Sequence, residues 1–571
     1  MDRTGIISID CRYPGELLEC VLAGVYHGGY ISRAEWPHFH RLEQVPVDPP
    51  PPRTPPKDWP PQSFGRFAQG FSLIFAPVPP TRKAGRVPPM AKRGSTPKTA
   101  AIFDLDRTLL SGASGPVLSA AMRQAGLLPD RRNPAEPLIF GIFNLFGENR
   151  PTMLASRQMA RVAKGWRVST VRKAAKAAAP VLAAAIQPYA KVLIEQHRQA
   201  GRVVVLATTT PYDLIAPFAK AAGFDAVIAT RFGTDSGAYD GTIDGEFVWG
   251  RGKAKAVAEW AEAKRVDLAE SFAYSDSFYD APLLAMVGHP QAVNPDPRLR
   301  ALATLRRWPA RWFDVPLGVP KFAGIEPQSA IMALARPELF PWVRFRIFGA
   351  NRIPEVGPAI IVANHRSYFD PFAVGITLAR RGRPVRFLGK KEVFDAPIVG
   401  DLARAMGGIR VDRGTGSDAP LQEAADALAA GDMVAIMPQG TIPRGREFYN
   451  PVLKGRWGAM RLAHDTRAPV IPMGLWGTEA VWPRSARLPN VLNVLSPPLV
   501  TIRVGKAVEL AYDDLEADTE RMMGAISTLL PPEGREWHEP TDEELARTVP
   551  PGTTPDGVDE AHEAQRRPGT D

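Results

Sequence analysis

Two aspartates, Asp104 and Asp106, lie at the end of the first strand expected in this 571-residue sequence. Residues 100–105 are expected to form a strand, and ligands of open α/β sheets bind at the carboxyl ends of strands. Carboxylates one residue apart at such an end could share a Mg²⁺ ion, with phosphate oxygens bridging to it. One carboxylate can attack phosphorus while the other handles the proton, which predicts phosphoryl-transfer chemistry.

Four further side chains follow in chain order, at the ends of predicted strands or at the start of a predicted helix: Thr208, Lys253, Asp276 and Asp280. Taken singly, a hydroxyl at a strand end or a lysine on a helix is an ordinary surface feature. Two aspartates separated by one residue are also a weak signal, because solvated turns contain them. The ordered set at strand ends makes catalysis the favoured interpretation.

These segments resemble the haloacid dehalogenase superfamily, specifically the subgroup with a helical cap that includes phosphoserine phosphatases. The resemblance covers about residues 99–300. It implies that Asp104 is the nucleophile that forms an aspartyl-phosphate and that Asp106 is the general acid/base. It also implies that Thr208 binds the transferring phosphoryl group and that Lys253 neutralises the charge around it. The implied Mg²⁺ ligands are Asp104, Asp106, Asp276 and Asp280.

The turn after the second predicted strand departs from the phosphoserine phosphatase pattern. Residues 208–211 read Thr-Thr-Thr-Pro, where those enzymes usually carry a Ser-Gly-Gly-like turn. The sequence therefore predicts a phosphomonoester phosphatase and leaves its substrate open.

A histidine and an aspartate follow a second apolar strand, expected over residues 359–363. A strand-to-helix turn can fold His365 back toward Asp370, so that the carboxylate keeps one imidazole nitrogen protonated and leaves the other free as a base. Such a base can take the proton of a substrate hydroxyl, whose oxygen then attacks an acyl thioester. For His365 alone, a packed structural histidine is the alternative.

Three more segments accompany this pair, at residues 408–413, 438–441 and 470–474. The four blocks in this order resemble the glycerolipid acyltransferase family, which includes the 1-acylglycerol-3-phosphate acyltransferases, over about residues 340–510. The resemblance implies acyl transfer from acyl-CoA or acyl-carrier protein to a lysophospholipid hydroxyl. With 1-acylglycerol-3-phosphate as the acceptor, the product would be phosphatidate.

The same resemblance implies a role for each block. His365 would be the base and Asp370 its orienter, while Pro472 would shape the acyl pocket. The acceptor phosphate would be bound by Arg413, Gly440 and Thr441.

The third block departs from the usual Glu-Gly-Thr-Arg, because this chain carries Gln439 and Ile442. Gln439 keeps an oxygen acceptor and can still orient neighbouring groups by hydrogen bonding. The charge of the missing arginine is expected from a nearby cation. The candidates are Arg444, Arg446 and Lys454.

Strands alternate with helices around both sites, which predicts two α/β domains. The first is expected to be a Rossmann-like parallel sheet with a helical cap, and the second a glycerolipid acyltransferase-like domain. The expected divisions are 98–300 for the first domain (cap about 112–200), 301–335 for a basic-aromatic connector and 336–530 for the second domain. Proline-rich residues 1–97 and the polar tail 531–571 are expected to be disordered. Met90 is an alternative start of the chain.

The net charge of +10 requires an acidic partner, and nucleic acid, anionic membrane and phosphorylated substrates all qualify. No nucleic-acid recognition motif is found, so that class is not expected. The cysteines, Cys11 and Cys20, both lie near the N-terminus, which fits a reducing cytoplasm. No apolar run is long enough to span a bilayer. Residues 340–348 mix aromatics with arginines and are expected either as an interfacial segment or as a helix packed on the second domain.

These observations predict a cytoplasmic, bifunctional enzyme peripherally associated with the inner face of the cell membrane. Its partners would be a phosphomonoester, a lysophospholipid and an acyl thioester. The alternative is an acyltransferase whose phosphatase-like domain is a regulatory or binding module.

Overall fold

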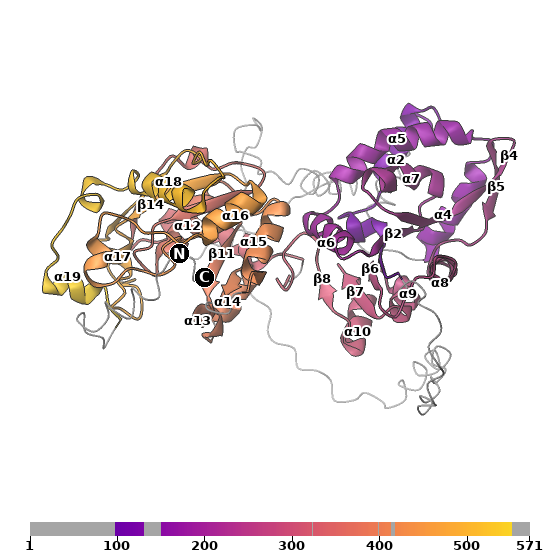
Figure 1. Ribbon diagram of the computed structural model, residues 1–571. Helices are drawn as coiled ribbons and strands as arrows, with labels where there is room; N and C mark the ends of the chain where they lie inside the picture. The colour runs from indigo at the N-terminus through magenta and orange to yellow at the C-terminus, as the bar shows by residue number, and fades with distance from the viewer. Residues whose placement is uncertain (1–97, 131–149, 322–323, 398, 413–416, 551–571) are drawn as a thin grey trace, which may run out of the picture. The chain divides into compact units, whose positions relative to one another are not determined.

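The computed structural model describes most of the chain (Figure 1), as residues 98–130, 150–321, 324–397, 399–412 and 417–550. The extension expected over residues 1–97, Arg413 (expected to bind the acceptor phosphate) and the last part of the tail lie outside the described residues.

A parallel six-stranded sheet forms the first domain, in the order β3-β2-β1-β6-β7-β8. Its strands are β1 Ala100–Phe103, β2 Val203–Thr208, β3 Ala226–Ala229, β6 Phe272–Ser275, β7 His289–Val293 and β8 Ala310–Arg311. β1 lies between β2 and β6, with Phe103 opposite Leu206 on one side and Tyr274 on the other. The residues that follow β1, β2 and β6 therefore meet at the middle of one sheet edge.

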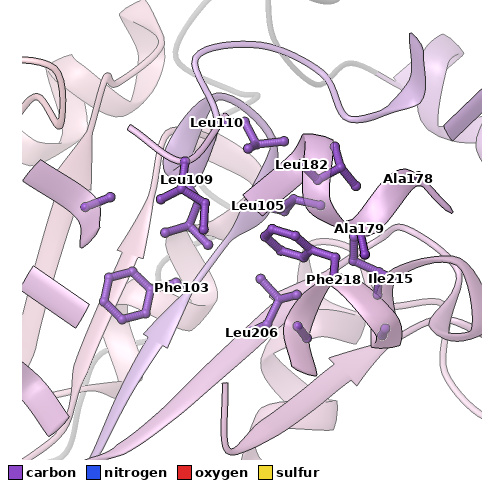
Figure 2. Close-up of a cluster of buried hydrophobic side chains, with 14 of the residues drawn as sticks. Phe103, Leu105, Leu109, Leu110, Ala178, Ala179, Leu182, Leu206, Ile215 and Phe218 are labelled. Carbon is purple, nitrogen blue, oxygen red and sulfur yellow. The ribbon is translucent and has the colours of Figure 1, made fainter. Parts of the chain in front are cut away.

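Apolar side chains hold this edge in place. All four residues of β1 are fully buried, as expected for a central parallel strand covered on both faces. Figure 2 shows Phe103 and Leu206 of the sheet with Ile215 and Phe218 of α7 (Tyr212–Ala221) and Leu182 of α5 (Val168–Ala184). Burying each of these side chains contributes about 1.5–3 kcal/mol. The site is thus built on a rigid scaffold.

Helices lie in the described residues between β1 and β2, where the cap is expected. They are α2 Gly115–Gln124, α4 Arg150–Val162, α5 and α6 Pro188–Gln199. α5 packs against α2 and α7, beside the hairpin of β4 (Arg231–Asp235) and β5 (Ala238–Asp244) (Figure 1). The sequence reading missed this hairpin. Its two-residue loop, Ser236-Gly237, has φ of 50° and 80°, the geometry that a type I′ turn requires.

The connector expected over residues 301–335 is wrong at both ends, because its last helix, α11 (Pro327–Leu334), packs on the second domain. Helix α10 (Pro297–Arg306) leads into β8, which pairs with β7 and completes the first sheet. Phe313 is 2% exposed in the core of the first domain. Because β8 has only two residues, it carries no alternating pattern that a sequence reading could detect.

The second domain contains a mixed seven-stranded sheet, in the order β12-β11-β13-β10-β14-β15-β9. Its strands are β9 Arg344–Phe348, β10 Ala359–Ala363, β11 Val385–Lys390, β12 Ile409–Val411, β13 Met433–Ile436, β14 Val470–Trp476 and β15 Leu499–Val504. β15 runs antiparallel to β14, and β9 pairs with β15 at the sheet edge. The prediction of two α/β domains is confirmed. The helix proposed within residues 340–348 is wrong, because the alternating pattern there forms β9.

Helices of the second domain are α11 Pro327–Leu334, α12 Asp370–Ala379, α13 Lys391–Asp395, α14 Val399–Ala405, α15 Ala419–Ala429, α16 Gly458–Thr466, α17 Thr478–Val481, α18 Leu515–Ser527 and α19 Asp542–Arg547. None of the helices in the described part of the chain is long and apolar enough to cross a membrane.

The tail expected to be disordered from residue 531 is ordered as far as residue 550. Thr541 and Glu544 form a capping box that begins α19. Thr548 accepts a hydrogen bond from the Gly445 N–H at 2.8 Å, and Tyr449 donates one to the Glu544 carbonyl at 3.2 Å. The expectation failed because it weighed composition and overlooked the Thr-x-x-Glu signal of a helix start.

Candidate functional sites

A buried lysine joins two carboxylates at the edge of the first sheet. Lys253, on α8 (Arg251–Lys264), donates to Asp104 Oδ1 at 2.8 Å and to Asp280 Oδ2 at 2.6 Å. Ser275 Oγ also donates to Asp280 Oδ2, at 2.8 Å. Lys253 and Asp280 are fully buried, so each charge depends on the other for compensation.

Burial of both aspartates of the first motif disfavours their charged forms. It raises the pKa of Asp104 to about 6, although Lys253 opposes the shift; nearby Asp280 and Asp106 add to it. Burial likewise raises the pKa of Asp106, opposed by hydrogen bonds from Ser114, whose N–H donates to Asp106 Oδ1 at 2.5 Å. Added positive charge at this edge would favour the ionised carboxylates.

Asp276 follows β6 and faces the loop after β1. Arg107 Nε lies 2.9 Å from Asp276 Oδ2. The backbone N–H of Asp276 donates to Thr108 Oγ1 at 3.0 Å. Arg107 has a φ of 59°, a left-handed conformation that is uncommon outside glycine. Sequence reasoning did not single out Arg107, although its place directly after Asp106 was a usable signal.

The carboxylates offer hard oxygen ligands of the kind that Mg²⁺ prefers, on neighbouring strand ends. Asp104, Asp106 and Asp276 fit such an ion in their chemistry, and they follow neighbouring strands of the sheet. However, nowhere in the described ranges do three acidic, histidine or cysteine side chains gather as a metal-ligand cluster. Arg107 engages Asp276, while Asp280 is held by Lys253 and Ser275. An ion at this edge would require Asp276 to turn away from Arg107.

Thr208 ends β2 and is 2% exposed. Its hydroxyl accepts a hydrogen bond from the Thr210 N–H at 3.2 Å, and Thr209 Oγ1 donates to the Val248 carbonyl at 2.9 Å. The Thr-Thr-Thr turn is therefore tied to its own backbone and to a neighbouring loop.

A hollow adjoins the first motif on the side of β7 and β8. Its lining residues are Arg107, Ser111, Gln187, Asn294, Asp314 and Lys321. Asn294 Nδ2 donates to the Arg107 carbonyl at 2.9 Å, and Lys321 forms an ion pair with Asp314. Sequence reasoning missed this hollow, because Lys321 lies far from every motif in the chain.

In the second domain, the turn after β10 folds His365 onto Asp370. His365 Nδ1 lies 2.7 Å from Asp370 Oδ2, and the N–H groups of Arg366 and Ser367 donate to the same oxygen at 2.6 and 2.8 Å. An ionised carboxylate only accepts hydrogen bonds, so Nδ1 carries the proton and Nε2 of the neutral ring keeps a lone pair. The pair has the arrangement of an oriented general base.

Gln439 supports this turn from the third block, since the His365 N–H donates to Gln439 Oε1 at 2.7 Å. Beyond it, Gly440 has a φ of 71°, and Thr441 Oγ1 accepts a hydrogen bond from Lys390 Nζ at 3.1 Å. Ile442 is 2% exposed, so the position that usually carries an arginine points into the interior.

A hollow at this site brings the first and third blocks together. It is lined by Asn364, His365, Arg366, Gln439, Pro443, Glu447, Phe448, Asn450, Val452, Leu453 and Lys454. Of the three proposed substitutes for the missing arginine, Lys454 lines the hollow, whereas Arg446 pairs with Glu539 at 3.0 Å. Pro472 lies within β14.

Arg366 is a further residue of this site that sequence reasoning missed. Its guanidinium bonds Glu479 at 2.9 Å and stacks between Phe448 and Trp476, at 4.2 and 4.3 Å from their ring centroids. Its position directly after His365 was the available signal. The stacking fixes the cation beside the hollow.

Comparison with known proteins places both domains. Residues 101–285 match the profile of the haloacid dehalogenase-like hydrolases, and residues 344–476 match the profile of the acyltransferases. The "inhibition of morphological differentiation protein" of Streptomyces azureus is 34% identical over 248 residues, which are 42% of this chain and 89% of that protein. A phosphoserine phosphatase of Mycobacterium tuberculosis is 30% identical over 271 residues, 43% of this chain and 85% of that protein.

Among solved structures, the 1-acyl-sn-glycerophosphate acyltransferase of Thermotoga maritima matches with 20% identity and a TM-score of 0.28, covering 37% of this chain and 81% of that one. The two profile matches follow one another along the chain, and the two relatives are each covered over more than four fifths of their own length. In its first domain the chain belongs to the haloacid dehalogenase-like hydrolases, and an acyltransferase domain follows it.

Proposed function

We propose that the protein is a bifunctional enzyme that hydrolyses a phosphomonoester in its first domain and acylates a lysophospholipid in its second. The oriented His365–Asp370 pair carries the proposal for the second domain, since His365 lines a hollow that residues of the first and third blocks share. For the first domain, the proposal is supported by Lys253, which is buried between Asp104 and Asp280.

In the first domain, Asp104 attacks phosphorus and forms an aspartyl-phosphate as the alkoxide leaves. Asp106 gives a proton to the leaving oxygen, and afterwards takes one from the water that hydrolyses the aspartyl-phosphate. Its raised pKa favours the protonated form that the first step requires. Lys253 offsets negative charge on Asp104 and the phosphoryl group, while Thr208 binds a phosphoryl oxygen. Mg²⁺, held by Asp104, Asp106 and Asp276, would supply further positive charge.

In the second domain, His365 Nε2 takes the proton of the acceptor hydroxyl, whose oxygen attacks the carbonyl carbon of the acyl thioester. The carbon–sulfur bond then breaks, and the thiolate leaves with the proton from the imidazolium. Asp370 stabilises the imidazolium between these steps. Lys454, Gly440 and Thr441 are proposed to bind the acceptor phosphate. The acyl donor is proposed to be acyl-CoA or acyl-carrier protein, and the acceptor 1-acylglycerol-3-phosphate.

The cation-free protein should bind Mg²⁺ more weakly as the pH falls. Because the pKa of Asp104 is about 6, its carboxylate is ionised at pH 7.5 and mostly protonated at pH 5. Protons therefore compete with the ion, and affinity should fall about tenfold between these pH values. Isothermal titration calorimetry measures this directly. Asp104→Asn should bind weakly at both pH values, and an affinity of the wild type that does not change with pH would contradict the proposal.

Replacing Gln439 should weaken acyl transfer only where the new side chain cannot accept the hydrogen bond from the His365 N–H. Gln439→Leu leaves the His365 N–H without its acceptor, which costs about 1–3 kcal/mol, so acyl transfer should fall roughly tenfold, mainly through a higher KM for the acceptor. Gln439→Glu keeps an acceptor oxygen and should remain active. Thiol release from acyl-CoA measures the activity of both variants. If Gln439→Leu were as active as Gln439→Glu, the hydrogen bond from Gln439 would have no role in acyl transfer.

A screen of phosphomonoesters and lysolipids with the full chain tests the whole proposal. If thiol release occurs without phosphate release from any phosphomonoester, the alternative of a regulatory first domain is favoured. If neither product appears with folded protein, the bifunctional proposal is wrong.

A further inference from the structure

An apolar loop projects from the second domain between α17 and β15. Three of its leucines are mostly exposed: Leu488 at 76%, Leu492 at 86% and Leu495 at 98%. Two valines, Val491 and Val494, are about half exposed. A concentration of large apolar side chains within eight residues is unusual for a surface in contact with water alone.

Hydrogen bonds give this loop a defined shape. The Asn490 N–H donates to the Val481 carbonyl at the end of α17, at 3.3 Å, and the Val494 N–H donates to Leu492 at 2.8 Å. At the far end, Arg344 Nε donates to the Pro497 carbonyl at 3.0 Å. The loop is fastened at both ends, and the leucines stay outside the core.

Arginines lie near both ends of the apolar loop. The edge strand β9 buries Phe345 and Ile347 only in part and turns Arg344 and Arg346 outward, where the loop joins β15. Phe348, on the same face, is 52% exposed, and Arg487 is exposed beside Leu488. Apolar side chains flanked by arginines and an aromatic ring match the chemistry of a bilayer with anionic headgroups.

The loop is continuous with the acyltransferase site. Ser367, two residues after His365, donates to the Trp482 carbonyl at 2.6 Å, and Trp482 leads into the loop. The rings of Tyr368 and Phe372 lie 5.7 and 6.4 Å from the Trp482 ring, and both are partly exposed. A half-exposed aromatic surface thus connects the loop with the turn that carries His365.

We propose that residues 488–495 insert into the apolar layer of a bilayer, while Arg344, Arg346 and Arg487 contact anionic headgroups. The loop would then hold the His365 site at the lipid surface, where a lysolipid acceptor is found. The choice of a lipid partner rests on the proposed acyltransferase function. The insertion itself is a property of the loop and can be measured without turnover.

Sedimentation of the full-length protein with vesicles of phosphatidylcholine and phosphatidylglycerol tests the insertion. Replacing two leucines together, by Leu492→Glu and Leu495→Glu, should weaken binding at least tenfold. Val356→Glu is the matched control, since Val356 is 84% exposed on the same domain outside the loop, and it should bind like the wild type. Arg346→Ser should weaken binding to these vesicles about fivefold and leave binding to pure phosphatidylcholine unchanged.

Wild-type binding by the double variant, or an equal loss in Val356→Glu, would overturn the proposal. So would a change from dimer to monomer in the double variant, because a second copy of the chain would then cover the loop. Thiol release with dispersed lysophosphatidate separates this proposal from the proposed function. If the wild type binds vesicles but never releases thiol, the acyltransferase proposal fails and the insertion stands. If the double variant loses vesicle binding but keeps thiol release with dispersed acceptor, the insertion proposal is supported separately from the reaction.

Discussion

Asp104→Asn should abolish phosphomonoester hydrolysis, lowering the rate by about 10³-fold or more, and should leave acyl transfer at its wild-type level. Asparagine has nearly the same size and can still accept the hydrogen bond from Lys253, so the buried edge of the sheet should keep its packing. Its amide cannot attack phosphorus to form an acyl-phosphate. Loss of the nucleophile therefore removes most of the rate enhancement of phosphomonoester hydrolysis. His365 follows β10 of the other sheet, so its chemistry should not change.

Phosphate release and thiol release should be measured on the same preparation of this variant. Glu259→Gln is the matched control, because Glu259 lies on the same helix as Lys253 with an exposed side chain and makes the same change from acid to amide. Mg²⁺-dependent phosphatase activity that persists in Asp104→Asn would assign the nucleophile elsewhere. Loss of both activities together would point to a damaged fold.

His365→Ala should have the second large effect. A positioned general base is typically worth about 10²–10⁴-fold in rate, so acceptor-dependent thiol release from acyl-CoA should fall by that amount. Phosphatase activity should stay unchanged. The hydrogen bond from the His365 N–H to Gln439 is retained in the variant, because it belongs to the backbone.

A surface pair of the same type provides the control for this variant. His538 Nε2 lies 2.9 Å from Glu544 on the exposed tail, so His538→Ala removes a histidine–carboxylate pair outside the hollow and should retain acyl transfer. Normal acceptor-dependent release by His365→Ala would remove the base assignment. Failure of the wild type with every glycerophospholipid acceptor would mean that the altered third block belongs to a different class of acceptor.

The sequence predicted the parts of the fold that rest on local apolar patterns. β1, β3 and β10 are continuous apolar runs, and the residues directly after β1 and β10 could be identified as site candidates. The short strand β8 and the edge strand β9 were missed, because one has too few residues and the other alternates arginines with apolar side chains. Such elements are defined by their partners in the sheet.

Contacts between distant segments were also beyond a reading of the sequence. The link between Lys253 and Asp280 depends on how α8 packs against the turn Phe278–Asp280, and nothing in either segment alone predicts it. The contact from the His365 N–H to Gln439 joins residues 74 positions apart. A resemblance could name Gln439 as unusual, but only the fold shows which backbone group its oxygen accepts from.

The ordered tail has a practical consequence for anyone who isolates the second domain. Gly445 and Tyr449 lie on either side of Glu447 and Phe448, which line the His365 hollow. Their hydrogen bonds reach Thr548 and Glu544 near the end of the described chain. The sheet and its last long helix are complete at residue 530. A fragment cut there would lose residues 531–550, and with them the hydrogen bonds that support the segment lining one side of the hollow. Acyl-transfer activity measured on that fragment should be lower than that of the full chain. A truncation or a C-terminal tag should therefore be placed after residue 550.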